Sequence, residues 1–343
     1  MNYPVAISRD SDPYQATLKA LELIQDGLVG LPKNIVLKPN VLSVNLNDCV
    51  VTNSRVCAAI ADFLKEKGFH HIILAEGSTH GRGGIVDTIE GFKNHDYATF
   101  GSKWRMIDLN KDDVGEWFNV YSPGLNLKVE LGIAKTVLSN SVISVPKFKT
   151  HDVLGLTLSL KNMMGSLCMA RNAETGEIIV RGNKAKVYMH GFGINQPAHL
   201  PKEINIGPSK LALAANILRL ITRVKPSLAV IDGTVAMEGD GPVRGSRKKL
   251  DLVLASVDPV AADVVAATIA GVNPYHTGYL YAAGLLGFGN HQLDKIRILG
   301  EKIEDVRKPF VMHRDFAKAK FTESEIIRLK KLTEQNSSQN RKP

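Results

Sequence analysis

The sequence lacks any apolar run approaching the roughly 18 residues needed to cross a lipid bilayer. Its opening, MNYPVAISRD, also lacks the basic-then-apolar order of a secretory signal. The composition, with 44% hydrophobic and 22% charged residues, is typical of a globular protein. We therefore expect a cytoplasmic protein without a membrane span.

Cysteine is scarce. Cys49, Cys57 and Cys168 are the only three, and no two of them form a C-x-x-C pair. This spacing excludes a ferredoxin-type cluster motif and argues against a disulfide framework. Three reduced thiols are the plainest interpretation, and a three-cysteine metal site assembled by the fold is the alternative. The cysteines of this chain are not expected to hold an iron–sulfur cluster.

Aromatic residues are also few, at 6% of the chain, although the net charge is +9. The basic excess lies partly in the C-terminal tail, and no basic block is interleaved with aromatic residues, which disfavours nucleic acid as a partner. The motifs G-x-S-x-G and H-E-x-x-H are absent, which disfavours serine hydrolases and zinc peptidases. The local clustering of lysines instead favours an anionic small molecule.

Short β-branched and aliphatic runs alternate with segments of helical period along most of the 343 residues. This alternation predicts an α/β protein with a mostly parallel sheet flanked by helices. We expect two α/β lobes, residues 1–150 and 151–305, with a cleft between them. A Gly- and Pro-rich loop insert at about residues 168–207 belongs to the second lobe, and residues 306–343 form a basic C-terminal helix with a disordered tail.

Helix starts can be located from capping residues. Asp12, or Ser11 before it, precedes a proline at the start of one periodic segment, and Thr52 or Asn53 precedes another. Asp258 stands before Pro259 in the same way. We expect these side chains to cap helices.

Polar residues follow the predicted strands at their carboxyl ends, where ligands bind in parallel sheets. These ends are Lys38-Pro39-Asn40, Glu76-Gly77-Ser78, Asp108, Pro146-Lys147, Asp232-Gly233 and Asp258-Pro259. Turn formation alone explains one such end, but six ends with a lysine, a carboxylate or both exceed what turns require. The sequence therefore predicts a ligand site at this edge of the sheet.

The segment VPKFKTHDVLGLTLSLKNMMG, residues 145–165, places four basic residues in a sequence otherwise typical of a core. If its first part is extended, Lys147, Lys149 and His151 share one face, and Lys161 lies farther along. Burial of an unpaired ammonium is costly, so these side chains either reach solvent or meet an anion. A phosphate or carboxylate group would suit them.

Carboxylates after the later strands provide a candidate metal site. Asp232 leaves a buried strand, and Glu238 and Arg244 follow in a glycine-rich segment. Asp263 lies in an otherwise apolar helix and needs a partner. Such carboxylates can hold Mg²⁺ against an anionic substrate. The alternatives are a turn cap for Asp232 and a salt bridge to a lysine for Asp263.

The segment AEGSTHGRGG is rich in glycine, which lets backbone amides approach an anion at a helix N-terminus. It matches neither G-x-G-x-x-G nor the P-loop, so no motif indicates a nucleotide. Glu76, Ser78 and His80 are candidate site residues, with simple turn roles as the alternative. His190 and His199, in the long loop, could reach the same site.

Six motifs, LKPN, AEGS, VPKFKTH, LSLKNMMG, IDGTVAMEGDGP and SVDPVAADVVAA, occur in this order. As an ordered set, over roughly residues 35–300, they resemble the family catalogued as domain of unknown function 362. The polar positions that match the family's motifs are Lys38, Asn40, Glu76, Lys147, Lys149, His151, Lys161, Asn162, Asp232, Glu238 and Asp263. Many members carry a fused ferredoxin-like module and are called iron–sulfur proteins for that reason. This chain has no such module, so that label does not transfer.

Together, these features favour an enzyme that acts on an anionic small molecule or cofactor precursor. The predicted catalytic residues are Lys147, Lys149, His151, Lys161 and Glu76. The predicted substrate-binding residues are Lys38, Asn40, Ser78, His80, Asn162 and Arg244. The predicted ligands of a Mg²⁺ ion are Asp232, Glu238 and Asp263. One alternative is a non-catalytic redox or iron–sulfur accessory protein that docks a ferredoxin-like partner through its basic tail. Another is a sensor that binds the same ligand without turnover.

Overall fold

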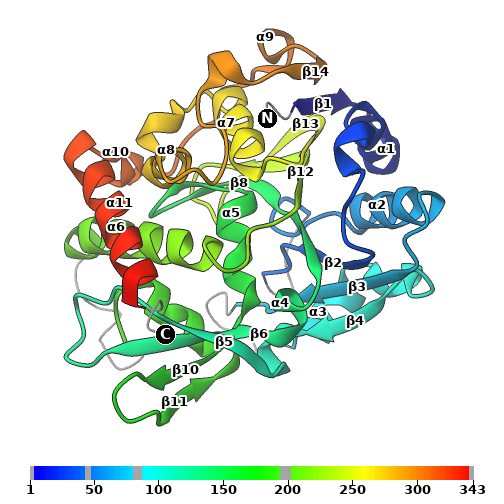
Figure 1. Ribbon diagram of the computed structural model, residues 1–343. Coiled ribbons are helices and arrows are strands. Elements are labelled where there is room, and N and C mark those ends of the chain that lie inside the picture. The colour runs from blue at the N-terminus through cyan, green and yellow to red at the C-terminus, as the bar shows by residue number, and fades with distance from the viewer. Residues whose placement is uncertain (1–3, 43–47, 80–86, 194–201, 340–343) are drawn as a thin grey trace.

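The computed structural model describes residues 4–42, 48–79, 87–193 and 202–339. Within them, ten strands form one mostly parallel sheet in the order β14-β1-β13-β12-β7-β2-β3-β4, and β8 and β9 extend it from β12 (Figure 1). Its strands are β1 (Val5–Arg9), β2 (Asn34–Pro39), β3 (His71–Glu76), β4 (Arg105–Asp108), β7 (Ser141–Val145), β8 (Lys147–His151), β9 (Gly155–Thr157), β12 (Leu228–Glu238), β13 (Ser246–Ser256) and β14 (Ile298–Gly300). The prediction of an α/β fold with a mostly parallel sheet is confirmed.

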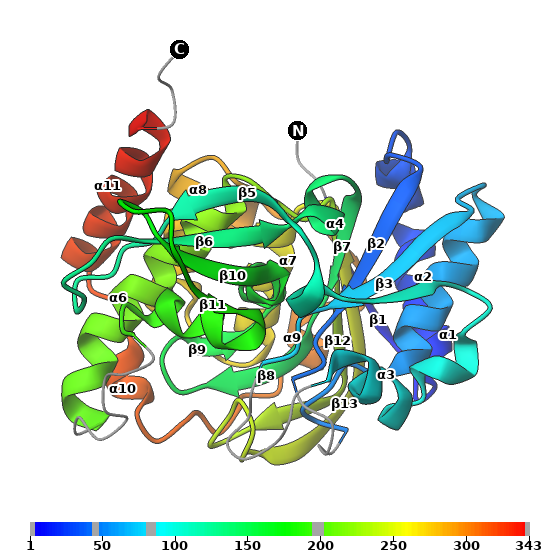
Figure 2. The same ribbon diagram turned by 90° about the horizontal axis from the view of Figure 1, so that it is seen from below.

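Helices cover both faces of this sheet (Figure 2). One face carries α1 (Pro13–Leu23), α2 (Ser54–Glu66) and α3 (Thr88–Asn94), and the other carries α5 (Ser159–Asn162), α6 (Lys202–Ile221), α7 (Pro259–Ile269) and α8 (Gly278–Leu285). Along β2, Ile35 and Leu37 pack in the hydrophobic core on the side of α1 and α2. Val36 packs in the core on the opposite side, with α7 and α8. A strand buried on both faces needs such a continuous apolar run, since successive side chains point to opposite faces.

The capping predictions are confirmed. The Asp12 side chain accepts a hydrogen bond from the Tyr14 N–H at the start of α1, and Asn53 caps α2 in the same way. Asp258 accepts from two backbone N–H groups at the start of α7. A capping residue predicts where a helix begins because its side chain accepts from backbone N–H groups that the helix itself leaves unpaired.

A second sheet has four antiparallel strands, β5 (Val114–Asn119), β6 (Val129–Ala134), β10 (Leu167–Asn172) and β11 (Ile178–Arg181). Neither β5 nor β6 is evident from the sequence pattern. The segment expected to be a loop insert contains most of β10 and all of β11. It also contains the 3₁₀ helix Gly182–His190 and the first turns of α6, which begins at Lys202. Pairing with β6 and packing of Leu167 and Met169 in the core stabilise β10 despite its glycine-rich surroundings.

In the large sheet β1, from residues 1–150, lies between β14 and β13, from residues 151–305, so the two predicted lobes share one sheet. The segment expected to be a loop after Asp232 is also strand, because β12 continues to Glu238 and pairs with β13. The remaining helices are α4 (Lys135–Leu138), α9 (Ile303–Val306), α10 (Phe316–Ala319) and α11 (Glu323–Gln339). No helix in the described ranges has the length and apolar character that a bilayer crossing requires.

Candidate functional site

A cavity of about 480 Å³ lies at the carboxyl ends of β2, β3 and β8 and is named here the carboxyl-edge cavity. Five of the predicted site residues line it: Asn40, Glu76, His151, Lys161 and Asn162. The 3₁₀ helix Gly182–His190 adds further polar side chains, and the β12–β13 connection adds Pro242 and Val243. Five residues that the sequence analysis selected from the strand ends and the following segment thus meet at one cavity.

A buried ion pair forms the floor of this region. The Lys38 Nζ donates to Glu76 Oε2 at 2.8 Å, and both side chains are almost fully buried. Asn162 accepts a longer hydrogen bond from the same ammonium and donates to the Lys38 carbonyl. Burial lowers the pKa of Lys38, and the Glu76 carboxylate opposes that shift. The Lys38–Glu76 pair is therefore a fixed part of the structure rather than two free site groups.

The backbone lies directly over this pair. A Cβ added at Gly165 would stand 1.7 Å from Glu76 Oε1 and 2.6 Å from Lys38 Nζ. A Cβ added at Gly77 would stand 2.5 Å from the Gly165 carbonyl oxygen. The motif LSLKNMMG ends in glycine here, and AEGS has glycine as its third residue, because no side chain fits between the two segments.

Lys147 forms a second buried pair. Its Nζ donates to Asp232 Oδ2 at 2.9 Å, and neither side chain exceeds 1% exposure. Asp232 also accepts from the Asn53 N–H and from the N–H and hydroxyl of Thr234. Its two oxygens are thus engaged by the chain itself. This contact ties β8 to β12 and to the start of α2.

Lys149, also buried, has no carboxylate partner among the described residues. Its Nζ donates to Asn40 Oδ1 at 2.7 Å and to the Val50 carbonyl at 2.8 Å. Burial, together with the charges of Lys161 and Lys147, lowers the pKa of Lys149 to about 7. Because neutral oxygens hold it, this ammonium leaves positive charge uncompensated in the site.

Asp263 positions the turn that carries Lys161. From inside α7 it accepts from the Ser159 N–H and hydroxyl and from the Leu160 N–H, at 2.6–3.1 Å. These N–H groups begin the short helix α5, which cannot satisfy them itself. Burial raises the pKa of Asp263 to about 7. The partner of this carboxylate is backbone, not the lysine that its sequence position suggested as the simplest partner.

Lys161 lines the carboxyl-edge cavity, and within the described ranges its ammonium has no hydrogen bond or ion pair. Burial lowers its pKa to about 8, and the charge of Lys38 acts in the same direction. The Asp152 carboxylate, at the same cavity, opposes the shift. Thr157 also lines the cavity with an unbonded, buried hydroxyl. Lys161 is therefore the cation best placed to meet a ligand.

Lys186 lines the same cavity and was missed by the sequence analysis. Its Nζ donates to the Gly77 carbonyl at 2.6 Å and to Asn110 Oδ1 at 2.7 Å. Burial lowers its pKa to about 8, and Glu76 opposes the shift. It comes from the 3₁₀ helix Gly182–His190, where the charged sequence RGNKAK suggests only an exposed loop, so no local signal identifies it.

His151 is 4% exposed and faces the cavity in a fixed orientation. Its Nδ1 accepts from the N–H groups of Val153 and Leu154, so Nε2 carries the ring proton. Asp152 Oδ1, 3.1 Å from the same Nδ1, itself accepts from the Val153 N–H. Burial holds the pKa of His151 well below its usual value, with the nearby Lys161 charge adding to the shift. The ring is therefore a neutral donor.

His190 also lines the cavity and lies 3.1 Å from the Ser209 hydroxyl. Burial and the Lys161 charge lower the pKa of His190 to about 4, so this ring too is neutral near pH 7. The expectation that a histidine of the long segment reaches the site holds for His190, whereas His199 lies outside the described residues.

Ser78, Arg244 and Glu238 do not line the cavity. Ser78 is buried and donates to the Val41 carbonyl, which makes it part of the turn after β3. Arg244 is exposed, and His80 is outside the described residues. Glu238 accepts from Lys248 at the far end of β12.

The three predicted Mg²⁺ ligands, Asp232, Glu238 and Asp263, are held by different parts of the chain. Across the described ranges, no three His, Cys, Asp or Glu side chains gather into a group that could hold a metal ion. Magnesium binding therefore stays a prediction.

The three cysteines are buried, and none of them forms a disulfide. Burial raises the pKa of each, well above its usual value for Cys57 and to about 11 for Cys168. The protonated thiol is thereby favoured over the thiolate that binds metals.

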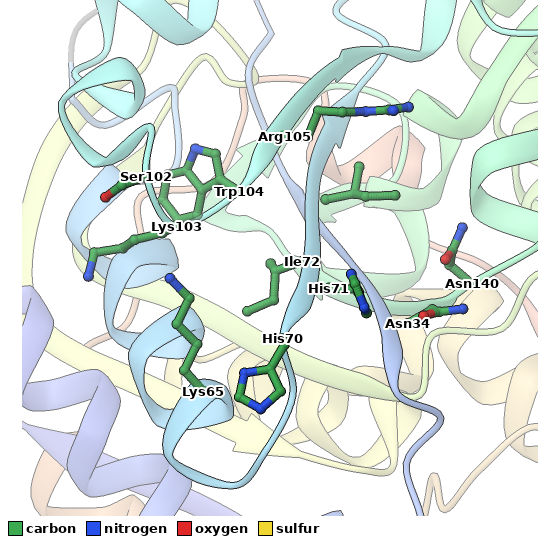
Figure 3. Close-up of a pocket in the computed structure, with 11 residues that line it drawn as sticks. Asn34, Lys65, His70, His71, Ile72, Ser102, Lys103, Trp104, Arg105 and Asn140 are labelled. Carbon is green, nitrogen blue, oxygen red and sulfur yellow. The ribbon is translucent and has the colours of Figure 1, made fainter.

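A second basic hollow lies at the opposite edge of the sheet, where β2, β3 and β4 begin (Figure 3). It measures about 520 Å³ and is named here the amino-edge hollow. Its basic lining residues are Lys65, His70, His71, Lys103 and Arg105. These side chains are exposed or half-buried, and Lys103 pairs with Asp62. Solvent accounts for this arrangement without a ligand.

A search for relatives matches the chain to a protein of Synechocystis sp. named "Thylakoid-associated protein sll1697". The two are 24% identical over 255 residues, which cover 70% of this chain and 64% of that protein. The chain thus spans less than two thirds of this relative's length. The family model described as "Domain of unknown function (DUF362)" matches residues 35–268. This match covers most of the chain and all of the strand ends that form the carboxyl-edge cavity, so the chain belongs to the DUF362 family.

Proposed function

We propose that this protein is an enzyme that binds an anionic small molecule in the carboxyl-edge cavity and moves a proton on it. The observation that carries the proposal is the unpaired ammonium of Lys161 in the cavity lining. In the same lining Lys186 adds a further cation, which within the described residues donates only to neutral oxygens. An anion would compensate this excess charge, which stability of the fold does not require.

Each group at the cavity has a distinct role in the proposal. Lys161 binds the anion, and its pKa of about 8 lets it give or take a proton near neutral pH. His151 donates from Nε2, since its Nδ1 is occupied by backbone N–H groups. The Lys38–Glu76 pair and Asp263 are positioning residues, which fix the strand ends and the α5 turn. Groups with depressed pKa values that meet at one cavity favour catalysis over binding alone.

Anion binding is tested by calorimetric titration at low ionic strength. The probe is inorganic sulfate, whose charge is constant from pH 6 to 10. We expect sulfate to bind the native chain and to lose at least tenfold in affinity in Lys161→Met. The matched control is Lys135→Met, which removes an exposed lysine that does not line the cavity. Equal sulfate affinity in the two variants would show that the anion does not bind in the carboxyl-edge cavity.

Turnover is tested by incubating each protein with a small-molecule cell extract and comparing the contents by mass spectrometry. If the protein is an enzyme, at least one anionic compound should be consumed in the native and Lys135→Met samples. The same compound should remain unchanged in the Lys161→Met sample. A ligand bound but unchanged would instead identify a sensor.

Other functions rank lower on the present observations. A redox or iron–sulfur accessory that docks a ferredoxin-like protein would use the basic C-terminal segment, but the buried thiols offer no thiolate for a cluster. A Mg²⁺ ion remains part of the proposal only as a companion of the bound anion.

We propose a cytoplasmic location. The name of the Synechocystis relative makes association with a membrane surface the alternative to test by cell fractionation.

A further inference from the structure

We infer that the ligand of the carboxyl-edge cavity is an amphipathic anion: one compact anionic head, a carboxylate or a phosphate monoester, joined to an apolar body. This inference rests on the proposed function and adds the chemical class of the ligand. The juxtaposition of lysine ammonium groups and an apolar wall in the same cavity supports it.

The apolar wall is built from several segments. Its residues are Val41, Leu42, Met164, Val187, Pro242 and Val243. They come from the loop after β2, the turn after α5, the 3₁₀ helix Gly182–His190 and the β12–β13 connection. Val187 leaves 40% of its surface exposed beside the cavity. Apolar side chains from four segments around one cavity are typical of a surface that an apolar ligand covers.

The positive charge of the polar wall comes from lysines. In the described ranges Lys161 and the exposed Lys184 have no hydrogen bond or ion pair, whereas the Lys186 ammonium already donates to Gly77 and Asn110. His151 and His190 are neutral rings near pH 7. The available ammonium groups therefore favour an anionic head group on the ligand.

The volume also fits a small amphiphile. About 480 Å³ corresponds to the space of roughly sixteen liquid water molecules. That space holds a head group and a body of eight or so carbon atoms with little surplus.

The test uses butyrate, hexanoate, octanoate and octyl phosphate as probes, titrated calorimetrically into the full chain. Affinity should rise about threefold to fourfold for each methylene added to the carboxylates, because each buries apolar surface in the cavity. Lys161→Met should weaken every member by at least tenfold, and Val187→Ser should flatten the rise with chain length. If circular dichroism shows that Lys161→Met does not fold, Lys161→Gln is used in its place.

The controls separate this inference from the proposed function. Sulfate binding that needs Lys161, together with an affinity that does not change from butyrate to octanoate, would overturn the amphipathic ligand and leave the anion site intact. Binding of 1-octanol as tightly as octanoate would overturn the role of the head group. Probe binding that is unchanged in Lys161→Met would overturn both proposals. If octyl phosphate exceeds octanoate, the head is a phosphate monoester; the reverse order identifies a carboxylate.

Discussion

Two basic hollows lie at opposite edges of the same sheet, and they differ in how the chain holds their cations. In the amino-edge hollow the cations are exposed or half-buried, and water solvates them (Figure 3). In the carboxyl-edge cavity Lys38 is fully buried, and Lys186 is 3% exposed. Each of these two has a fixed hydrogen-bond partner, whereas Lys161 has none within the described ranges. Lys161 is itself half-buried, so the two hollows differ in the buried lysines Lys38 and Lys186 that surround it and not in the exposure of Lys161.

The difference has a physical cause. Burial of an ammonium without a partner costs several kcal/mol, so a fold retains it only where something compensates the charge. A solvent-exposed lysine carries almost no such cost, and its ion pairs contribute little. Equal pocket volumes at the two edges therefore do not imply equal function.

The largest expected effect is on stability. Glu76→Ala leaves the Lys38 ammonium buried without a carboxylate, and we expect a loss of about 3–5 kcal/mol in the free energy of unfolding. Lys103→Met removes the pair of Lys103 with Asp62 at the amino edge, and the loss there should stay below about 1 kcal/mol. Urea denaturation measures both. Similar losses would show that the two edges do not differ as described.

A second prediction concerns pH. The pKa of Lys149 is about 7 in the folded chain and near 10.5 when unfolded, so the unfolded chain binds more protons between these values. Stability should therefore rise with pH from about 7 to 10, by a few kcal/mol in total, with Lys161 and Lys186 contributing in the same direction. Lys149→Met should reduce this rise, as denaturation at successive pH values would show. An unchanged slope would mean that Lys149 stays charged in the fold.

A third prediction tests the close approach at Gly165. Gly165→Ala places a methyl group against Glu76 and Lys38, and we expect a loss of about 1–3 kcal/mol from displacement of the buried pair. Gly27→Ala is the matched control, since its Cβ would meet Val257 at an ordinary 3.4 Å. Thermal unfolding of the two variants should separate them clearly. Equal melting temperatures would mean that the loop after α5 moves aside at little cost.

A fourth prediction concerns ligand affinity. Sulfate binding at the carboxyl-edge cavity requires protonated Lys161, whose pKa is about 8. Affinity should thus fall by up to tenfold per pH unit above that value and stay nearly constant well below it. In Lys161→Met the remaining affinity should be lower and should fall less steeply with pH, because Lys186, whose pKa is also about 8, still titrates in the cavity. Calorimetric titration at pH 6, 7, 8 and 9 measures it, and a flat profile in the native chain would exclude Lys161 as the anion's partner.

The smallest effect belongs to the amino-edge hollow. Arg105→Gln should weaken sulfate binding there only slightly at low salt and not measurably at 0.15 M, because exposed charges are screened over about 8 Å. Shifts in the ring resonances of His70 and His71 on titration report this contact. Tight, salt-resistant binding at this edge would reverse the contrast between the two hollows.

Much of the fold could be read from local patterns. The caps at Asp12, Asn53 and Asp258 and the apolar runs of the parallel strands depend on neighbouring residues alone. The antiparallel strands β5 and β6 could not be read in this way, because pairing with residues distant in the sequence stabilises them. The continuation of β12 to Glu238 likewise depends on its partner β13.

For the site, the sequence by itself determined which side chains stand at the carboxyl ends of the strands, since strand direction and period follow from local chemistry. Only the tertiary structure decided their roles. It pairs Lys38 with Glu76 and Lys147 with Asp232, and it directs Asp263 to the α5 turn. It also brings Lys186 to the cavity and leaves Lys161 unpaired within the described ranges. The reason is that a charge's partner and burial depend on segments folded together from distant parts of the chain, which no local pattern encodes.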